Sequence, residues 1–197
     1  MSTNPPLRRM TGLTMVELIM FIVVVSVGIA GILMVFNVAV KGSADPMQRK
    51  QAIAIAEALL TEIEQHPFTY CDPQDANVLT ATAGNQCAND EDKGGAALTA
   101  PTPAGETRYS LSTPFNNVAD YGGFTKSNID DISGNNAMSG YSASVTITRA
   151  GNGLPQSPSA VPDGAALRIQ VTITYNSGRD SVTLTGYRLR YAPNSAG

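Results

Sequence analysis

The sequence predicts an α+β fold in which a long N-terminal helix packs against an antiparallel sheet of about four strands. Three observations predict it. An uncharged apolar run extends from Leu18 to Val40, a helical apolar pattern follows at 46–66, and apolar residues alternate with polar ones in several later segments. With 197 residues, the chain has the length of one domain with an appendage.

The apolar run is long enough to cross a bilayer, because a helix of ~20 residues spans the ~30 Å hydrocarbon layer. Arg8 and Arg9 precede it, as the positive-inside rule expects. A secretory signal would have a shorter apolar core, although "GSA" at 42–44 could serve as its cleavage site. A plain membrane anchor does not account for Glu17, since a carboxylate costs up to ~2.5–3.5 kcal/mol at the centre of a membrane helix and less near the interface. The alternative is that Glu17 merely snorkels at the interface of an anchor.

A second helical segment is predicted at 46–66. Asp45 as N-cap, Pro46 at the first helical position and Gln48 form a capping-box signature, so we expect the long helix to restart or kink at Pro46. His66 and Pro67 end the segment, and His66, the one histidine, is interpreted as a cation at the helix end. The apolar face that should cover the sheet consists of Ile53, Ile55, Ala56, Leu59, Leu60 and Ile63.

Residues 67–106 are predicted to form a loop. If this part of the chain is exported, Cys71 and Cys87 should form a disulfide, which would add very roughly 3 kcal/mol of stability. A metal site is not expected, because the chain has one histidine and no CxxC pair. Asp90 and Asp92 lack the other ligands of a calcium loop and are better interpreted as a solvated acidic turn, with Asp130/Asp131 as a weaker alternative for calcium.

The sheet region is predicted at 107–191. Alternating patterns place strands at 107–113, 141–149, 166–175 and 181–191, with a hairpin loop at 176–180. The apolar phase of the last strand changes after Leu184, which suggests a bulge near Gly186. The Gly- and Asn-rich segment 114–140, with its aromatic residues Phe115, Tyr121 and Phe124, is expected at an exposed edge.

The stretch "TGLTMVELIMF" resembles the processing site of type IV pilins and of type II secretion pseudopilins. The resemblance divides the chain into a leader at 1–12, a transmembrane and assembly helix at 13–44, and a periplasmic pilin domain at 45–197 with the pilin-like roll fold. It implies cleavage by prepilin peptidase between Gly12 and Leu13, followed by N-methylation of Leu13. Leu13 stands where the family usually has Phe or Met.

The chemistry of this site gives Glu17 a role. Cleavage creates an α-ammonium on Leu13, and an unpaired charge is costly in the dry helix bundle of a filament. Glu17 of one subunit can neutralise the Leu13 ammonium of a neighbour and fix the axial register of the two helices, as a polar residue does in a coiled-coil seam.

A narrower resemblance lies in "GSADPMQRKQAIAIAEALLTEIEQHPF", which is similar to the juxtamembrane segment of MshD-like minor pilins of MSHA-type pili. It implies a minor pilin that is inserted in the inner membrane with a periplasmic C-terminal domain and is then assembled into the extracellular filament. The implied partners are other pilin subunits, prepilin peptidase and the assembly platform in the inner membrane.

Other functions are also considered. A minor pseudopilin of a type II secretion system is the closest alternative, and segment 114–140 could provide an adhesin or DNA-uptake surface. We expect no catalysis and no cofactor, because no catalytic constellation is present, so an anchored periplasmic enzyme is disfavoured. The charged fraction of 15% and the net charge of −3 give no sign of nucleic-acid binding.

Overall fold

The computed structural model describes residues 12, 14–135, 137–155 and 161–195. For residues 38–45 it describes the backbone only. The leader at 1–11 and Leu13 therefore lie outside the described residues. The chain divides into two compact units, one up to Met47 and one from Gln48 onward. The helix and the sheet of this chain give an α+β architecture.

Helix α1 (Met15–Gln65) includes the residues expected in both helical segments. It contains Pro46, so the prediction that Asp45 caps a new helix at this point is wrong. Proline removes one backbone hydrogen bond but its own dihedral angles are helical, and the helical assignment continues through it. The helix ends at Gln65, as predicted, because Pro67 disfavours a helical conformation at His66.

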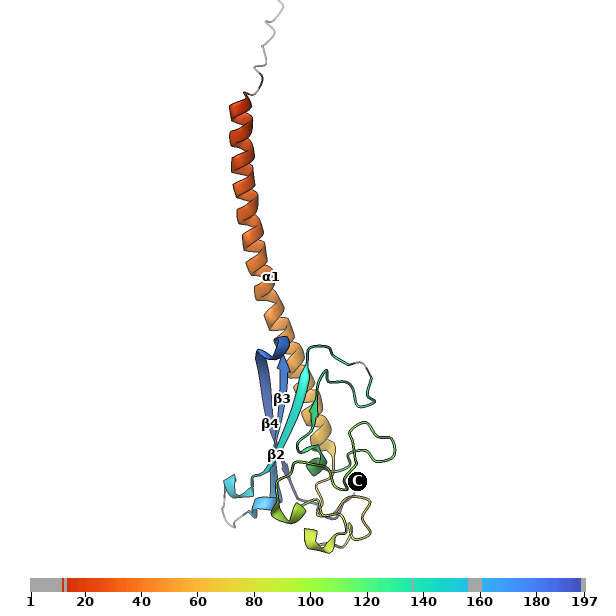
Figure 1. The fold of residues 1–197 in the computed structure, drawn as a ribbon. Helices are drawn as coiled ribbons and strands as arrows, with labels where there is room; N and C mark the ends of the chain where they lie inside the picture. Colours follow the sequence, from red (N-terminus) through yellow and green to blue (C-terminus); the bar gives the residue numbers. More distant parts are fainter. Residues whose placement is uncertain (1–11, 13, 136, 156–160, 196–197) are drawn as a thin grey trace, which may run out of the picture. The chain divides into compact units, whose positions relative to one another are not determined.

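The sheet has four antiparallel strands in the order β1-β2-β3-β4 (Figure 1). They are β1 (Thr125–Lys126), β2 (Ser142–Arg149), β3 (Ala166–Tyr175) and β4 (Asp180–Leu189). The three long strands confirm the prediction. The strand expected at 107–113 is wrong, because that segment consists of turns with one isolated bridge from Thr107 to Pro114.

The hairpin between β3 and β4 is confirmed. Asn176, Ser177 and Gly178 form η6 (Asn176–Gly178), all three with positive φ, and the pairing then runs without interruption from Tyr175–Asp180 to Ala166–Leu189. The bulge expected near Gly186 is therefore wrong. The apolar phase changes because Tyr187 and Leu189 are about half exposed on the outer face, while Val182 and Leu184 pack against the core.

The main core lies between the inner face of the sheet and the part of α1 that follows Gln48. Four helix positions that are spaced by about one turn are almost fully buried: Ala52, Ala56, Leu59 and Ile63. The sheet contributes the alternate residues of β2 and β3, namely Ala143, Val145, Ile147, Leu167, Ile169, Val171, Ile173 and Tyr175. The predicted packing of a helical stripe on a pleated face is thus confirmed, but of the residues expected in the stripe Ile55 and Leu60 are only partly buried and Ile53 is not part of this core.

The chain between α1 and β1 has little regular structure. It contains three short 3-10 helices, η1 (Gly84–Gln86), η2 (Lys93–Gly95) and η3 (Val118–Tyr121). Cys71 and Cys87 are joined by the predicted disulfide, next to a small core of Val78 and Ala81. Between β2 and β3 lie η4 (Gly151–Gly153) and η5 (Asp163–Ala165).

Candidate functional site

The start of α1 places Gly12 and Glu17 on either side of the helix N-terminus. Gly12 is exposed and outside the helix. Thr14 precedes the first helical residue, and its Oγ1 accepts a hydrogen bond of 3.3 Å from the backbone N–H of Glu17. Gly12, on the N-terminal side of the expected scissile bond, is therefore accessible, whereas Leu13 on its other side lies outside the described residues.

Thr14 is a residue that our sequence analysis missed. Thr14 and Glu17 have the Thr-x-x-Glu spacing of a capping box, a signal that was readable in "TMVE". Glu17 thus has a local role at the third helical position, where a negative charge is favourable near the positive end of the helix dipole. This role is worth only ~0.3–1 kcal/mol and does not require glutamate rather than glutamine.

The side chain of Glu17 is exposed, and among the described residues its carboxylate has no hydrogen bond or ion pair. Its expected partner, the amino group of a processed Leu13, lies outside the described residues. The carboxylate is therefore placed where a group from another chain can reach it.

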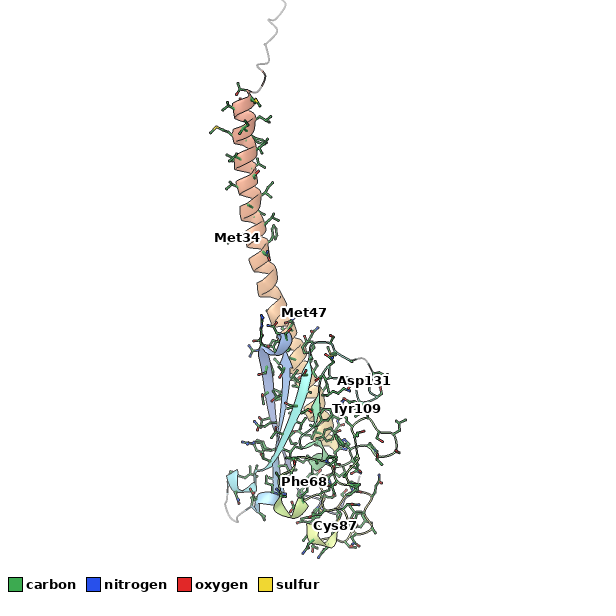
Figure 2. The ribbon with its side chains drawn as sticks, viewed as in Figure 1. Met34, Met47, Phe68, Cys87, Tyr109 and Asp131 are labelled. Atoms are coloured by element: carbon green, nitrogen blue, oxygen red, sulfur yellow. A yellow bond between two sulfur atoms is a disulfide. The ribbon has the colours of Figure 1, made fainter. Side chains whose placement is uncertain are left out.

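The helix that follows is apolar on all sides. Met15–Asn37 is long and apolar enough to cross a membrane, and every large apolar side chain in it is exposed (Figure 2, Met34). Within this segment, the hydroxyl of Ser26 donates a hydrogen bond of 2.6 Å to the carbonyl of Ile22. A Cβ at Gly28 or Gly31 would meet nothing within 4 Å, so both glycines leave room for a neighbouring helix.

At the other end, α1 carries a buried polar network. Arg108 donates two hydrogen bonds to the Glu62 carboxylate at 2.7 and 2.6 Å, and Tyr121 Oη donates a third at 2.8 Å. His66 Nε2 lies 3.1 Å from the same phenol oxygen, within hydrogen-bond distance. The network fastens the end of the helix to the long loop.

Burial decides the charges in this network. Burial and the neighbouring Glu62 raise the pKa of Tyr121. Burial lowers the pKa of His66 although the nearby carboxylates raise it, and this direction disfavours the interpretation of His66 as a helix-end cation. Burial opposes a charge on Arg108, but the hydrogen bonds and charge of Glu62 outweigh it and raise the pKa.

Segment 114–140 does not lie at an exposed edge as a whole. Phe115 and Tyr121 are 8% and 1% exposed and pack edge-to-face at 4.9 Å, with Phe124 beside them. Farther along, Ile132 and Met138 are exposed and line an open groove of about 430 Å³ beside Ile55 and Leu59 of α1. Any recognition surface in this segment is thus limited to its second half.

The two acidic pairs considered for calcium have other partners. Asp90 accepts hydrogen bonds from two backbone N–H groups, and Asp92 pairs with Arg190 at 3.1 Å. Asp130 pairs with Lys126 at 3.1 Å. Among the described residues, no three histidine, cysteine or acidic side chains are arranged to hold a metal ion.

Comparison of the chain with protein-family models gives no match, and comparisons with characterised proteins and with solved structures give none either. A relationship to prepilins therefore depends on the N-terminal residues and on their chemistry.

Proposed function

We propose that this chain is a type IV pilin-like prepilin that serves as a minor pilin subunit of an MSHA-like pilus. One observation carries the proposal: an accessible Gly12 precedes the apolar segment Met15–Asn37, whose one acid, Glu17, lies in the first helical turn without a partner among the described residues. In a simple membrane anchor this carboxylate would serve only the local capping role, which does not require a charged side chain.

Assembly is the mechanism. Before processing, the apolar helix holds the subunit in the inner membrane and its body faces the periplasm. Prepilin peptidase cuts after Gly12, and the new amino group of Leu13 becomes N-methylated. The subunit then leaves the bilayer at the assembly platform as Glu17 pairs with the Leu13 ammonium of a neighbouring subunit.

The energetics favour a filament as the destination. A helix that is apolar on all sides is stable only where its whole circumference meets lipid or other apolar helices. Gly28 and Gly31 permit close helix contacts, which replace lipid contacts one for one. A charge pair formed at the same time offsets the desolvation of both ions.

The antiparallel sheet with one helix on its inner face is compatible with the pilin-like roll. The disulfide between Cys71 and Cys87 is compatible with an oxidising compartment outside the cytoplasm. Both features support the proposal without being specific to pilins.

Mass spectrometry of the native N-terminus tests the proposal. We expect a chain that begins at Leu13 and carries one methyl group on its amino nitrogen. Gly12→Asp should leave the larger, unprocessed form in the membrane. A native chain that begins at Asp45, or normal processing of Gly12→Asp, would show that the segment is not a prepilin leader.

Co-isolation separates the pilus from a type II secretion system. We expect the processed chain in sheared filaments, and deletion of pilus assembly genes should remove it from the cell surface. Loss of protein secretion with unaltered pili would instead identify a minor pseudopilin.

A further inference from the structure

The long loop between α1 and β1 contains five buried acidic side chains, and four of them interact with one another. Asp72, Glu91, Glu106 and Asp120 are each 5% exposed or less. They come from four separate stretches of the chain. Asp72 follows α1, Glu91 follows the disulfide, Glu106 precedes the aromatic residues of segment 114–140, and Asp120 lies in η3. Their burial is unusual, because ionised carboxylates are rarely buried without a partner.

Hydrogen bonds join three of these acids through Asn116. Its Nδ2 donates to Asp72 at 3.0 Å and to Glu106 at 3.2 Å, and its backbone N–H donates to Asp120 at 3.1 Å. Asp120 also accepts from the backbone N–H groups of Thr102 and Asn117, at 3.0 and 2.9 Å. The cluster therefore connects stretches that no sheet or helix holds together.

Glu91 differs from the other three acids. It is 1% exposed, and neither of its carboxylate oxygens has a hydrogen-bond partner among the described residues. Oε2 of Glu106 and Oδ1 of Asn116 are also buried without a partner there. These unpartnered atoms of Glu91, Glu106 and Asn116 are all oxygens, and Glu91 interacts electrostatically with Asp120, Asp72 and Glu106.

Basic groups do not neutralise the cluster. Within the described part of the chain, no Lys or Arg forms an ion pair with any of the four acids. Lys93 attracts Glu91 and Glu106 from a distance, but its Nζ donates to the Ala100 carbonyl and to Thr102 Oγ1. His66 interacts with Asp120, but burial lowers the pKa of His66 and so disfavours a positive charge on it.

We propose that this acid cluster is held together by protons on Glu91 and Glu106, and that it acts as a pH-sensitive latch for the loop at 67–124. Protons are the counter-charge that fits the described geometry, because no three ligands there are arranged around one point for a metal ion. A protonated carboxyl removes one negative charge and supplies one O–H donor to a neighbouring oxygen.

The acid–base properties agree with this geometry. Burial and the charge of Asp120 raise the pKa of Glu91 from 4.5 to about 10. Burial and the charges of Asp120 and Asp72 raise the pKa of Glu106 from 4.5 to about 8. Burial also raises the pKa of Asp120, although backbone N–H groups oppose the shift.

The sign of the pH dependence follows from these shifts. Both glutamates bind protons more tightly in the folded than in the unfolded chain, so their contribution is fully present below about pH 4.5. It declines as pH rises, up to about 8 for Glu106 and about 10 for Glu91. In these windows the release of each proton increases the unfolding constant by up to ~10-fold for each unit that the pH rises.

Glu91→Gln tests the proposal in the full-length protein in detergent. Glutamine is nearly isosteric and always neutral, so the variant should become more stable relative to wild type as pH rises. Between about pH 5 and about pH 8, the ratio of the two unfolding constants should change by up to ~1000-fold. The measured quantity is the change of this ratio with pH. Any loss of stability that the substitution causes equally at both pH values does not alter this change.

Asp75→Asn is the matched control. Asp75 is also a buried acid of this loop, but it accepts backbone hydrogen bonds from Asn77, Ala88 and Asn89, which lower its pKa. This variant should lose stability at neutral pH and gain nothing on alkalinisation. Glu106→Gln provides a second variant. Its stability relative to wild type should increase as pH rises and level off near pH 8.

Hydrogen exchange locates the latch. Protection of the amides of Thr102, Asn116 and Asn117, which donate to Asp120, should fall between neutral and alkaline pH. The amides of β3 should keep their protection, and Glu91→Gln should preserve protection at both places.

Two results would overturn the proposal. One is a Glu91→Gln variant whose stability relative to wild type does not change with pH. The other is stabilisation of wild type, but not of Glu91→Gln, by millimolar calcium at about pH 8, because the cluster would then hold a cation instead of protons.

Discussion

The two parts of α1 use apolar residues in opposite ways. In Met15–Asn37 every large apolar side chain is exposed, whereas after Gln48 a single stripe is buried against the sheet. A striped helix satisfies its apolar surface within its own chain. A helix that is apolar all round needs lipid or other helices, so its environment has to come from outside the subunit.

The acids on the two parts of α1 show the same difference. Glu62 is held by Arg108 and Tyr121 of its own chain. Glu17 has no such partner among the described residues and lies at a helix start that is exposed. We infer that the first acid serves folding and the second serves assembly.

Glu17→Ala gives the sharpest test of this difference. Processing should continue, while incorporation into filaments should fall on the order of 100-fold, as expected when one partner of a desolvated ion pair is removed. Quantitative blots of sheared filaments measure it. Glu17→Gln keeps the helix-capping geometry and should fail equally, so normal incorporation of either variant would remove Glu17 from its assembly role.

Arg108→Ala tests the acid at the other end of the helix. It leaves Glu62 with one fewer buried partner and should destabilise the body by about 3–5 kcal/mol, measured by urea unfolding. The double variant Arg108→Met with Glu62→Leu should lose less, because both charges are removed together. An equal loss in the two variants would contradict the ion-pair explanation.

Leucine truncations compare the two apolar surfaces directly. Leu59→Ala removes a side chain that is 2% exposed and should cost about 2–5 kcal/mol of unfolding free energy. Leu33→Ala removes one that is 62% exposed and should change the stability of the body by less than about 0.5 kcal/mol. Similar losses at both positions would show that the two parts do not have separate roles.

Gly186→Ala should have the smallest effect. A Cβ there would lie 2.1 Å from Glu64 Oε1 and 3.0 Å from Leu60 Cδ1, and the flexible glutamate can move away. We expect a loss of about 1 kcal/mol by thermal unfolding. Adding Glu64→Ala to Gly186→Ala should restore most of the lost stability. If the double variant is no more stable than Gly186→Ala, the clash is with Leu60 instead of Glu64.

The strand predicted at 107–113 is absent and the unpredicted strand β1 is present, which shows that sequence patterns do not identify weak or very short strands. The weak alternation at 107–113 does not form a strand, and the two-residue β1 (Thr125–Lys126) takes the edge beside β2 instead. Two residues are too few for any alternation to be detected. Pairing with the neighbouring β2 is the tertiary contact that makes them a strand.

The burial of the first part of segment 114–140 could not be predicted from its composition. Its Gly and Asn residues are typical of exposed loops, but Asn117 forms a capping box with Asp120 that turns Tyr121 inward. Local hydrogen bonds of this kind allow polar residues to be fully buried. The aromatic residues were a signal of burial that we interpreted as a surface feature.

The sequence by itself determined the apolar helix, the stripe at its second half, the faces of β2 and β3, the hairpin and the pair of cysteines. These features follow from hydrophobic periodicity, turn residues and redox chemistry, which act over short distances along the chain. The tertiary structure alone decided which acids are buried together. Asp72, Glu91, Glu106 and Asp120 are far apart in the sequence, and only the folded loop places them in one electrostatic environment.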